Sequence, residues 1–168
     1  MSYTAPTQEQ KFVLEVIAGI EELSGLPGFG DFDAELVPAI VDEAGKFANE
    51  VWAPLNRAGD QEGARWNDGV VTLPDGFRDA YRRYVEAGWG SLTASPDHGG
   101  QGLPFALSAA VQESLTSANM AFSLCPMLTL GAIEALEAHA SDEQKALYLP
   151  RLVTGEWAGT MNLTEPQA

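Results

Sequence analysis

Apolar residues recur every three or four positions along most of this chain, and that spacing restricts its fold more than any other feature. From about Gln8 to Leu23 the apolar positions share one helical face, until the run SGLPGFG breaks the pattern. A second stripe extends from Asp33, a candidate N-cap, to Leu55. Such segments are stable when their apolar faces pack together, so the sequence predicts helices packed against helices.

One short interruption of the helical pattern has a different character. In ARWNDGVVTLPDGF, Asp68 and Gly69 stand between two short apolar runs. An Asp-Gly pair in this position is typical of a tight hairpin turn, so the sequence predicts a small extended flap. A third helix is expected from about Gly76 to Ala87, and Gly88 is well placed to end it.

The C-terminal half returns to the helical pattern. Residues 104–140 are rich in Ala, Leu, Met and Ser, and we expect them to divide into two helices near Asn119 or Pro126. Ser141 is followed three residues later by Gln144, which is a capping-box sequence. The pattern therefore predicts a further short helix that begins at this point.

The last residues are predicted to be extended. Trp157 to Leu163 has the character of a β-strand, and a strand needs a neighbour with which to pair. We expect an all-α antiparallel domain of about six helices over residues 1–155, which includes an N-terminal extension helix over residues 1–30. Residues 156–168 are expected to be a terminal strand stub, the truncated start of a middle β domain.

The charge of the chain restricts its ligands. The net charge is -15 and the isoelectric point is about 4.2. Such a surface repels phosphate backbones and anionic lipids, so we expect no binding to nucleic acid or to membranes. No apolar run approaches the roughly 20 residues that span a bilayer. Polyanionic ligands would have to find most of their phosphate contacts outside this chain.

Cysteine, histidine and the first residues restrict location and metal chemistry. Cys125 is the only cysteine, so no intrachain disulfide can form, and the chain suits a reducing cytoplasm. The first residues lack a basic stretch followed by an apolar core, so no signal peptide is expected. His98 and His139 have no partner at metal-ligand spacing. We therefore predict a cytoplasmic protein without a metal site.

Two stretches resemble the acyl-CoA dehydrogenase family. SPDHGGQGLP, from Ser95 to Pro104, resembles the Gly-Gly-x-Gly loop of that family. SDEQKALYLPRLVTGEWAGTMNLTEPQA, from Ser141 to Ala168, resembles its Glu-Gln-Lys helix, its Gly-Glu-Trp turn and its Thr-Glu-Pro flavin motif, in that order. YTAP and KFVLEV, from Tyr3 to Val16, resemble the longer bacterial members, the subgroup that includes methylmercaptopropionyl-CoA dehydrogenase.

The resemblance implies an FAD-dependent oxidoreductase. Its members remove a proton from the α-carbon of an acyl-CoA, transfer the β-hydride to the flavin and release a 2-enoyl-CoA. Their electrons usually pass to an electron-transfer flavoprotein. By the resemblance, Met161, Leu163 and Thr164 lie against the flavin ring, where strand-end backbone groups and the threonine hydroxyl can form hydrogen bonds.

The resemblance also suggests an acyl pocket. Residues 123–131 align with the part of the family that lines it, which makes Met127 and Gly131 candidates to set its depth. The alternative is that these residues belong to an ordinary helical core, because an apolar helix face is more often core than pocket.

The family motif continues beyond what is seen in this sequence. Thr-Glu-Pro-x-Ala is normally followed by Gly-Ser-Asp, then by a β domain and a helical bundle that supplies the catalytic base and many FAD contacts. We therefore assign no catalytic residue and expect the chain alone to be inactive. An apolar face left uncovered would favour homo-oligomers. Two alternatives stay open: a non-catalytic helical module that binds acyl-CoA or a partner subunit, and an all-α domain of unrelated function.

Overall fold

Helices dominate the computed structural model, which describes residues 3–162 and 164–167. Within these residues there are seven α-helices and one small hairpin, which confirms the predicted all-α class and its flap. Short π-helical and 3-10 turns extend or connect several helices. In chain order the elements are α1 (Thr7–Phe12), α2 (Val37–Phe47), α3 (Ala53–Glu62), β1 (Arg65–Asn67), β2 (Val70–Thr72), α4 (Phe77–Glu86), α5 (Phe105–Ala118), α6 (Met120–His139) and α7 (Asp142–Val153).

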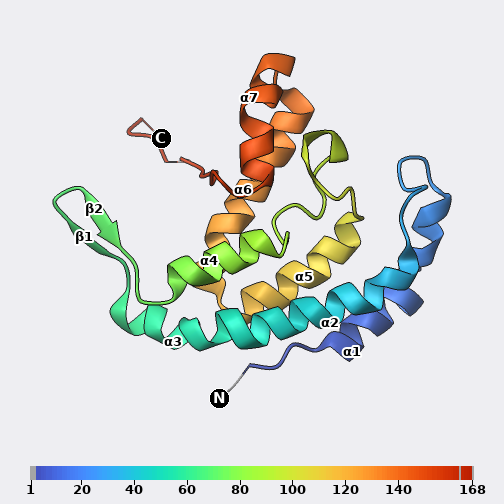
Figure 1. Cartoon of the computed structure of the whole chain (residues 1–168), viewed down its shortest axis with the longest axis horizontal. Helices are drawn as coiled ribbons and strands as arrows, with labels where there is room; N and C mark the ends of the chain where they lie inside the picture. The colour runs from blue at the N-terminus through green and yellow to red at the C-terminus, as the bar shows by residue number, and fades with distance from the viewer. Residues whose placement is uncertain (1–2, 163, 168) are drawn as a thin grey trace.

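One long helical run forms the base of the fold (Figure 1). Helix α2 continues through the π-helical turn Ala48–Trp52 into α3 without an intervening loop. Helices α1 and α5 pack against α2, and α6 packs against α3, α5 and α7. In Figure 1, α6 and α7 rise together away from this base, and the hairpin projects beyond the end of α3.

Trp52 lies in the core that joins the base to the other helices. Its side chain is fully buried, with its ring centroid 4.6 Å from that of Phe122 on α6 and 5.4 Å from that of Tyr84 on α4. Large aromatic side chains remove much apolar surface from water, and tilted ring pairs add a favourable electrostatic contribution. This aromatic cluster therefore holds α4 and α6 on the α2–α3 run.

The N-terminal extension differs from the single helix predicted for residues 8–23. Helix α1 passes into a π-helical turn, Val13–Ile17. The helix then ends, because Gly19 adopts the left-handed conformation with φ of +59°. A 3-10 turn, Ile20–Gly25, follows. Glycine adopts positive φ without steric cost, and the bend buries Ile20, whose side chain is 1% exposed. The predicted helix was therefore too long, because burial of Ile20 requires the bend.

Gln10 fastens this extension to α5. Its Nε2 donates hydrogen bonds to the Ala110 carbonyl oxygen at 3.0 Å and to Glu113 Oε2 at 3.1 Å. Its Oε1 accepts a bond from Ser114 Oγ at 3.1 Å. A buried amide is stable only with its hydrogen bonds made, so this residue anchors α1 on a helix about a hundred positions further along the chain.

Local capping predictions are confirmed. Asp33 accepts a hydrogen bond from the backbone of the turn that it begins. The long C-terminal helical region divides at Asn119, whose side chain caps α6, whereas Pro126 lies inside that helix. Ser141 and Gln144 form both hydrogen bonds of the capping box at the start of α7. These ends depend on side chains bonding to nearby backbone, which is why sequence spacing located them.

The predicted hairpin is present and is strongly exposed. Strands β1 and β2 pair antiparallel across Asp68 and Gly69, whose φ values are +47° and +82°. Trp66 stands opposite Val71 in this ladder, and their side chains are 73% and 59% exposed. Positive φ at both central residues is the geometry that favours Asp-Gly in such turns.

The predicted terminal strand does not form in the described residues. Residues 157–162 are in no strand, and Leu163 lies outside the described residues. A strand is defined by ladder hydrogen bonds to a neighbour, and the described part of the chain supplies none at this point. The division of the chain into residues 1–155 and 156–168 stays a prediction.

Helix α6 leaves much of its apolar surface uncovered. It is long and apolar enough to cross a membrane by length and composition alone, which corrects the expectation that no segment would reach that threshold. Core helices of soluble proteins pass the same test, yet only 28% of its most apolar window is buried. Met120 and Leu124 are 65% and 49% exposed. An apolar face this open is typical of a surface that packs against another domain or chain.

Candidate functional site

Met127 and Gly131, the candidates for an acyl pocket, lie on the open side of α6. The Met127 side chain is 48% exposed. A Cβ atom added at Gly131 would meet no other atom within 4 Å. Both residues therefore belong to an uncovered helix face in this chain, and neither is enclosed by the described residues.

A second segment, after α7, runs beside α6 and is fastened to it. The Gly159 backbone N–H donates a 3.0 Å hydrogen bond to Thr129 Oγ1, which itself donates to the Cys125 carbonyl oxygen at 3.0 Å. A Cβ atom at Gly159 would lie 2.7 Å from the Ala132 Cβ. Only glycine allows so close an approach, so this residue type decides how the segment packs.

The predicted flavin residues lie just beyond that attachment. Met161 is 60% exposed, Thr164 is also exposed, and Leu163 lies outside the described residues. Among the described residues, no backbone hydrogen bond joins residues 160–162 to another part of the chain. Their N–H and C=O groups are therefore free to bond to a ligand or to a neighbouring strand. Backbone polar groups need such a partner once they are shielded from water.

The structure does not bring the two sets of predicted residues into one closed site. Met127 and Thr129 are two positions apart on α6, so their side chains point about 200° apart around the helix axis. Five of the cavities along the described residues are lined by other residues, and none of the five includes Met127, Gly131, Met161 or Thr164. A complete flavin and acyl site would need further surfaces.

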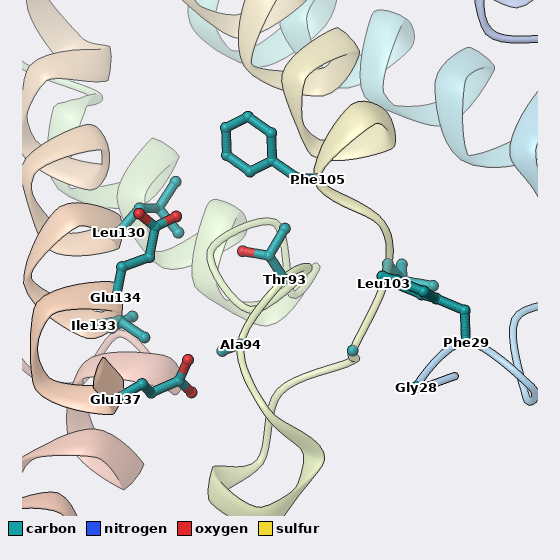
Figure 2. A pocket seen from close by; sticks show the side chains of 11 residues that line it. Gly28, Phe29, Thr93, Ala94, Leu103, Phe105, Leu130, Ile133, Glu134 and Glu137 are labelled. Carbon is teal, nitrogen blue, oxygen red and sulfur yellow. The ribbon is translucent and has the colours of Figure 1, made fainter. Parts of the chain in front are cut away.

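A cavity of about 370 Å³ lies between the Gly-rich loop and α6, and sequence reasoning missed it (Figure 2). The carboxylates of Glu134 and Glu137 reach into it from α6, and Thr93 faces them from the segment that leads into the loop. The Ser95 N–H donates to Glu137 Oε1 at 3.0 Å.

No Lys or Arg is among the lining residues, so this cavity would repel the phosphates of FAD or coenzyme A. The spacing of the two glutamates on one helix face was its only sequence signal.

The Gly-rich loop itself is shaped by backbone packing. A Cβ atom at Gly100 would collide with the carbonyl oxygen of Ala94. The Gly102 N–H donates to the Ala94 carbonyl at 3.0 Å, and the Leu103 N–H donates to the Leu92 carbonyl at 2.8 Å. The loop therefore folds back on its own preceding segment, and its glycines make room for that return.

No metal-binding arrangement is found within residues 3–162 and 164–167. There, no group of three or more His, Cys, Asp or Glu side chains could hold an ion. His98 ends a 3-10 turn, Pro96–His98. Cys125 is exposed, yet desolvation by the neighbouring side chains raises the pKa of its thiol, which keeps it protonated at neutral pH.

The family follows from comparison with known proteins. The family model for the acyl-CoA dehydrogenase N-terminal domain matches residues 35–156, which extend from the turn just before α2 to just past α7. The chain belongs to the acyl-CoA dehydrogenase family. The match includes the Gly-rich loop and the capping-box helix on which the resemblance rested, and it begins after the N-terminal extension.

Individual relatives agree with this membership. Over all 168 residues the chain is 46% identical to a 3-methylmercaptopropionyl-CoA dehydrogenase from Ruegeria pomeroyi, of which it covers 29%. It is 31% identical to a butyryl-CoA dehydrogenase from Syntrophomonas wolfei, with 99% of this chain and 28% of that protein covered. The resemblance to the longer bacterial dehydrogenases is therefore confirmed. The chain spans less than a third of the length of these relatives.

A solved structure shares the fold of this dehydrogenase-family domain. It comes from work on the electron transferring flavoprotein of Acidaminococcus fermentans, and it matches with a TM-score of 0.65 over 82% of this chain and 34% of that one. The sequence identity is 24%, so the likeness shows a common helical fold alone.

Proposed function

We propose that this chain is the N-terminal part of an FAD-dependent acyl-CoA dehydrogenase that oxidises the α,β C–C bond of an acyl-CoA thioester to a 2-enoyl-CoA. The observation that carries the proposal is the 46% identity to the Ruegeria enzyme along the whole chain. That enzyme and the butyryl-CoA dehydrogenase supply the two substrates to test first, 3-methylmercaptopropionyl-CoA and butyryl-CoA.

The residues after Gly159 suit one edge of a flavin ring. The backbone groups of residues 160–162 have no partner in the described chain, and Met161 and Thr164 are exposed. The ring of FAD carries donors and acceptors along its pyrimidine edge, which such backbone groups and the Thr164 hydroxyl could satisfy. Bound there, FAD would accept the hydride from the acyl β-carbon. The Thr129–Gly159 hydrogen bond would hold this segment at α6.

The open face of α6 would line the acyl pocket. Met127 and Gly131 lie one turn apart on that face, so a larger side chain at either would reduce the space for an acyl chain. Exposed apolar side chains such as Leu124 would then be covered by substrate or by a neighbouring domain.

This chain would contribute only part of the site. We infer that the catalytic base and the phosphate contacts come from outside these residues, because the chain is strongly acidic and spans less than a third of its relatives. The chain alone would then neither retain FAD nor oxidise an acyl-CoA. In the whole enzyme, we propose an electron-transfer flavoprotein as acceptor, a homo-oligomeric assembly and a cytoplasmic location.

A chimera tests the function directly. This chain replaces the aligned 168 residues of the Ruegeria enzyme, and the product is assayed for bound flavin by visible absorption and for oxidation of both acyl-CoA substrates. The expected result is a yellow, active protein, whereas the chain alone stays colourless after incubation with FAD and removal of the excess. An inactive but folded chimera would reject the proposed function. Flavin retained by the chain alone would reject the inferred division of the site.

Variants of the chimera test the individual residues. Met127→Trp should raise KM for the longer acyl chain without changing flavin content, and Thr164→Val should weaken flavin retention. Ala138→Trp, at an exposed position of α6 about three turns beyond Met127 along the helix, is the matched control and should change neither. Equal effects from Met127→Trp and Ala138→Trp would remove Met127 from the acyl pocket.

A further inference from the structure

The chain has an apolar groove that the proposed dehydrogenase site does not use. A cavity of about 430 Å³ lies between the end of the hairpin, α4, α6 and the segment after α7. Its aromatic residues are Phe77, Tyr81 and Phe122, and the ring centroids of Phe77 and Phe122 are 5.2 Å apart. A concave surface of this size with aromatic lining is typical of small-molecule sites.

The groove is held open by contacts within the chain. The Tyr81 hydroxyl donates a 3.2 Å hydrogen bond to the Gly155 carbonyl oxygen, which joins α4 to the turn after α7. The Thr129–Gly159 bond holds the segment after α7 against α6, and Ala158, the residue before Gly159, forms one wall. Packing of Phe122 in the Trp52 core fixes its ring at the base. A ligand would therefore meet a largely preformed surface, and little ordering would oppose its binding.

A single available cation stands at the groove. Arg78 is exposed, lines the cavity and takes part in no ion pair within the described residues, whereas Arg82 on the same helix is paired with Asp79 and Glu86. The carboxylate that also lines the groove, Glu156, lies 3.6 Å from the Arg151 guanidinium. One guanidinium matches one carboxylate, and the acidic surface around it disfavours ligands with several negative charges.

We propose that this groove binds an unbranched aliphatic monocarboxylate, a free fatty acid, with its chain over Phe77 and Phe122 and its carboxylate at Arg78. Burial of the aliphatic chain of the ligand supplies most of the affinity, and the positive charge of Arg78 selects a carboxylate head group. The site is separate from Met127 and Gly131, because Ala121 and Cys125 line it from another side of α6. It requires neither FAD nor coenzyme A.

The one cysteine of the chain provides the probe. Cys125 lines the groove, so an occupant should slow its reaction with dithionitrobenzoate at mildly alkaline pH. Decanoate should give saturable protection with one site per chain. Decanol, which lacks the charge, should bind about threefold more weakly, as expected for one exposed ion pair. Protection that does not saturate, or equal affinity for decanoate and decanol, would overturn the proposal.

Matched variants separate the groove from general adsorption. Ala121→Trp fills the groove and should abolish protection, while Ala135→Trp, at an exposed position on the same helix, should leave it intact. Arg78→Gln should remove the preference for decanoate over decanol, and Arg83→Gln should not. Circular dichroism establishes that each variant is folded. If Ala121→Trp unfolds, the comparison of Arg78→Gln with Arg83→Gln tests the proposal by itself. An unchanged preference for decanoate over decanol in Arg78→Gln would then contradict the proposed site.

Discussion

Gly159 and Thr129 are joined by a 3.0 Å hydrogen bond from backbone N–H to side-chain Oγ1, and this bond fixes the C-terminal segment on α6. Residues 160–162, beyond this bond, have backbone groups without hydrogen-bond partners in the described chain. Glu156 and Ala158, before it, line the apolar groove. One side chain thus positions both the residues proposed to meet the flavin and the wall of the proposed fatty-acid site.

Replacing Thr129 should release that segment. Thr129→Val keeps the shape of the side chain but removes the acceptor, at a cost of about 1 kcal/mol. Amide exchange at Gly159, measured by mass spectrometry or NMR, should then accelerate about fivefold. Thr160→Val changes an exposed threonine on the same segment and should leave the rate unchanged. Unchanged exchange at Gly159 in Thr129→Val would show that other contacts hold the segment.

Asn119 should be among the most costly polar residues to replace. It is 2% exposed, its Oδ1 accepts from the Phe122 N–H at 3.1 Å, and its Nδ2 donates to the Trp52 carbonyl at 3.3 Å. Asn119→Ala removes a helix cap and leaves a buried carbonyl without this donor, a loss of about 2–3 kcal/mol. Urea unfolding measures it. The exposed cap Ser141 is the comparison, since Ser141→Ala should cost about 1 kcal/mol, and equal losses would contradict the role of burial.

Gly100 should tolerate no side chain. Gly100→Ala places a methyl group against the Ala94 carbonyl oxygen and should lower the free energy of unfolding by at least about 2 kcal/mol. Gly30→Ala is the control, because a Cβ atom there meets nothing within 4 Å, and its stability should stay the same or rise by up to about 1 kcal/mol. Thermal unfolding followed by circular dichroism compares the two, and similar midpoints would contradict the tight loop packing.

Tyr84 should make the fold sensitive to alkali. Burial raises the pKa of Tyr84 far above the ordinary tyrosine value of about 10, so the unfolded chain ionises first. Its contribution is fully present below about pH 10 and is lost above it, at about 1.4 kcal/mol per pH unit. Urea unfolding between neutral pH and pH 11 should therefore show a shallower alkaline decline in Tyr84→Phe. Tyr148→Phe, at an exposed position, should keep the steep decline, and identical profiles for the two variants would refute the assignment.

Local signals in the sequence anticipated much of the fold. The hairpin at Asp68-Gly69, the division at Asn119 and the capping box at Ser141 each depend on residues a few positions apart. The hydrogen bonds and backbone angles that define these features involve only neighbouring residues, so sequence spacing alone predicts them. The prediction of one long helix over residues 8–23 was wrong, and so was that of a strand as far as residues 157–162 are concerned. Both outcomes depended on a distant partner, which the described residues do not supply for the strand.

The candidate site was less predictable than the fold. The sequence named Met127, Gly131, Met161 and Thr164 through a family resemblance, yet these residues remain on open surfaces. The cavity at Glu134 and Glu137 and the groove at Arg78 had no motif to mark them. Cavities form where several elements meet, and no short window of sequence contains all of their walls.

The sequence by itself determined the helical class, most element boundaries, the acidic surface and the family, because these depend on periodicity, neighbouring residues and composition. Only the tertiary structure decided that Gln10 bonds to Ser114, that Gly159 bonds to Thr129 and that one face of α6 stays uncovered. Those outcomes depend on which elements approach one another in space. Helical periodicity shows that a face is apolar, but only packing shows what covers it.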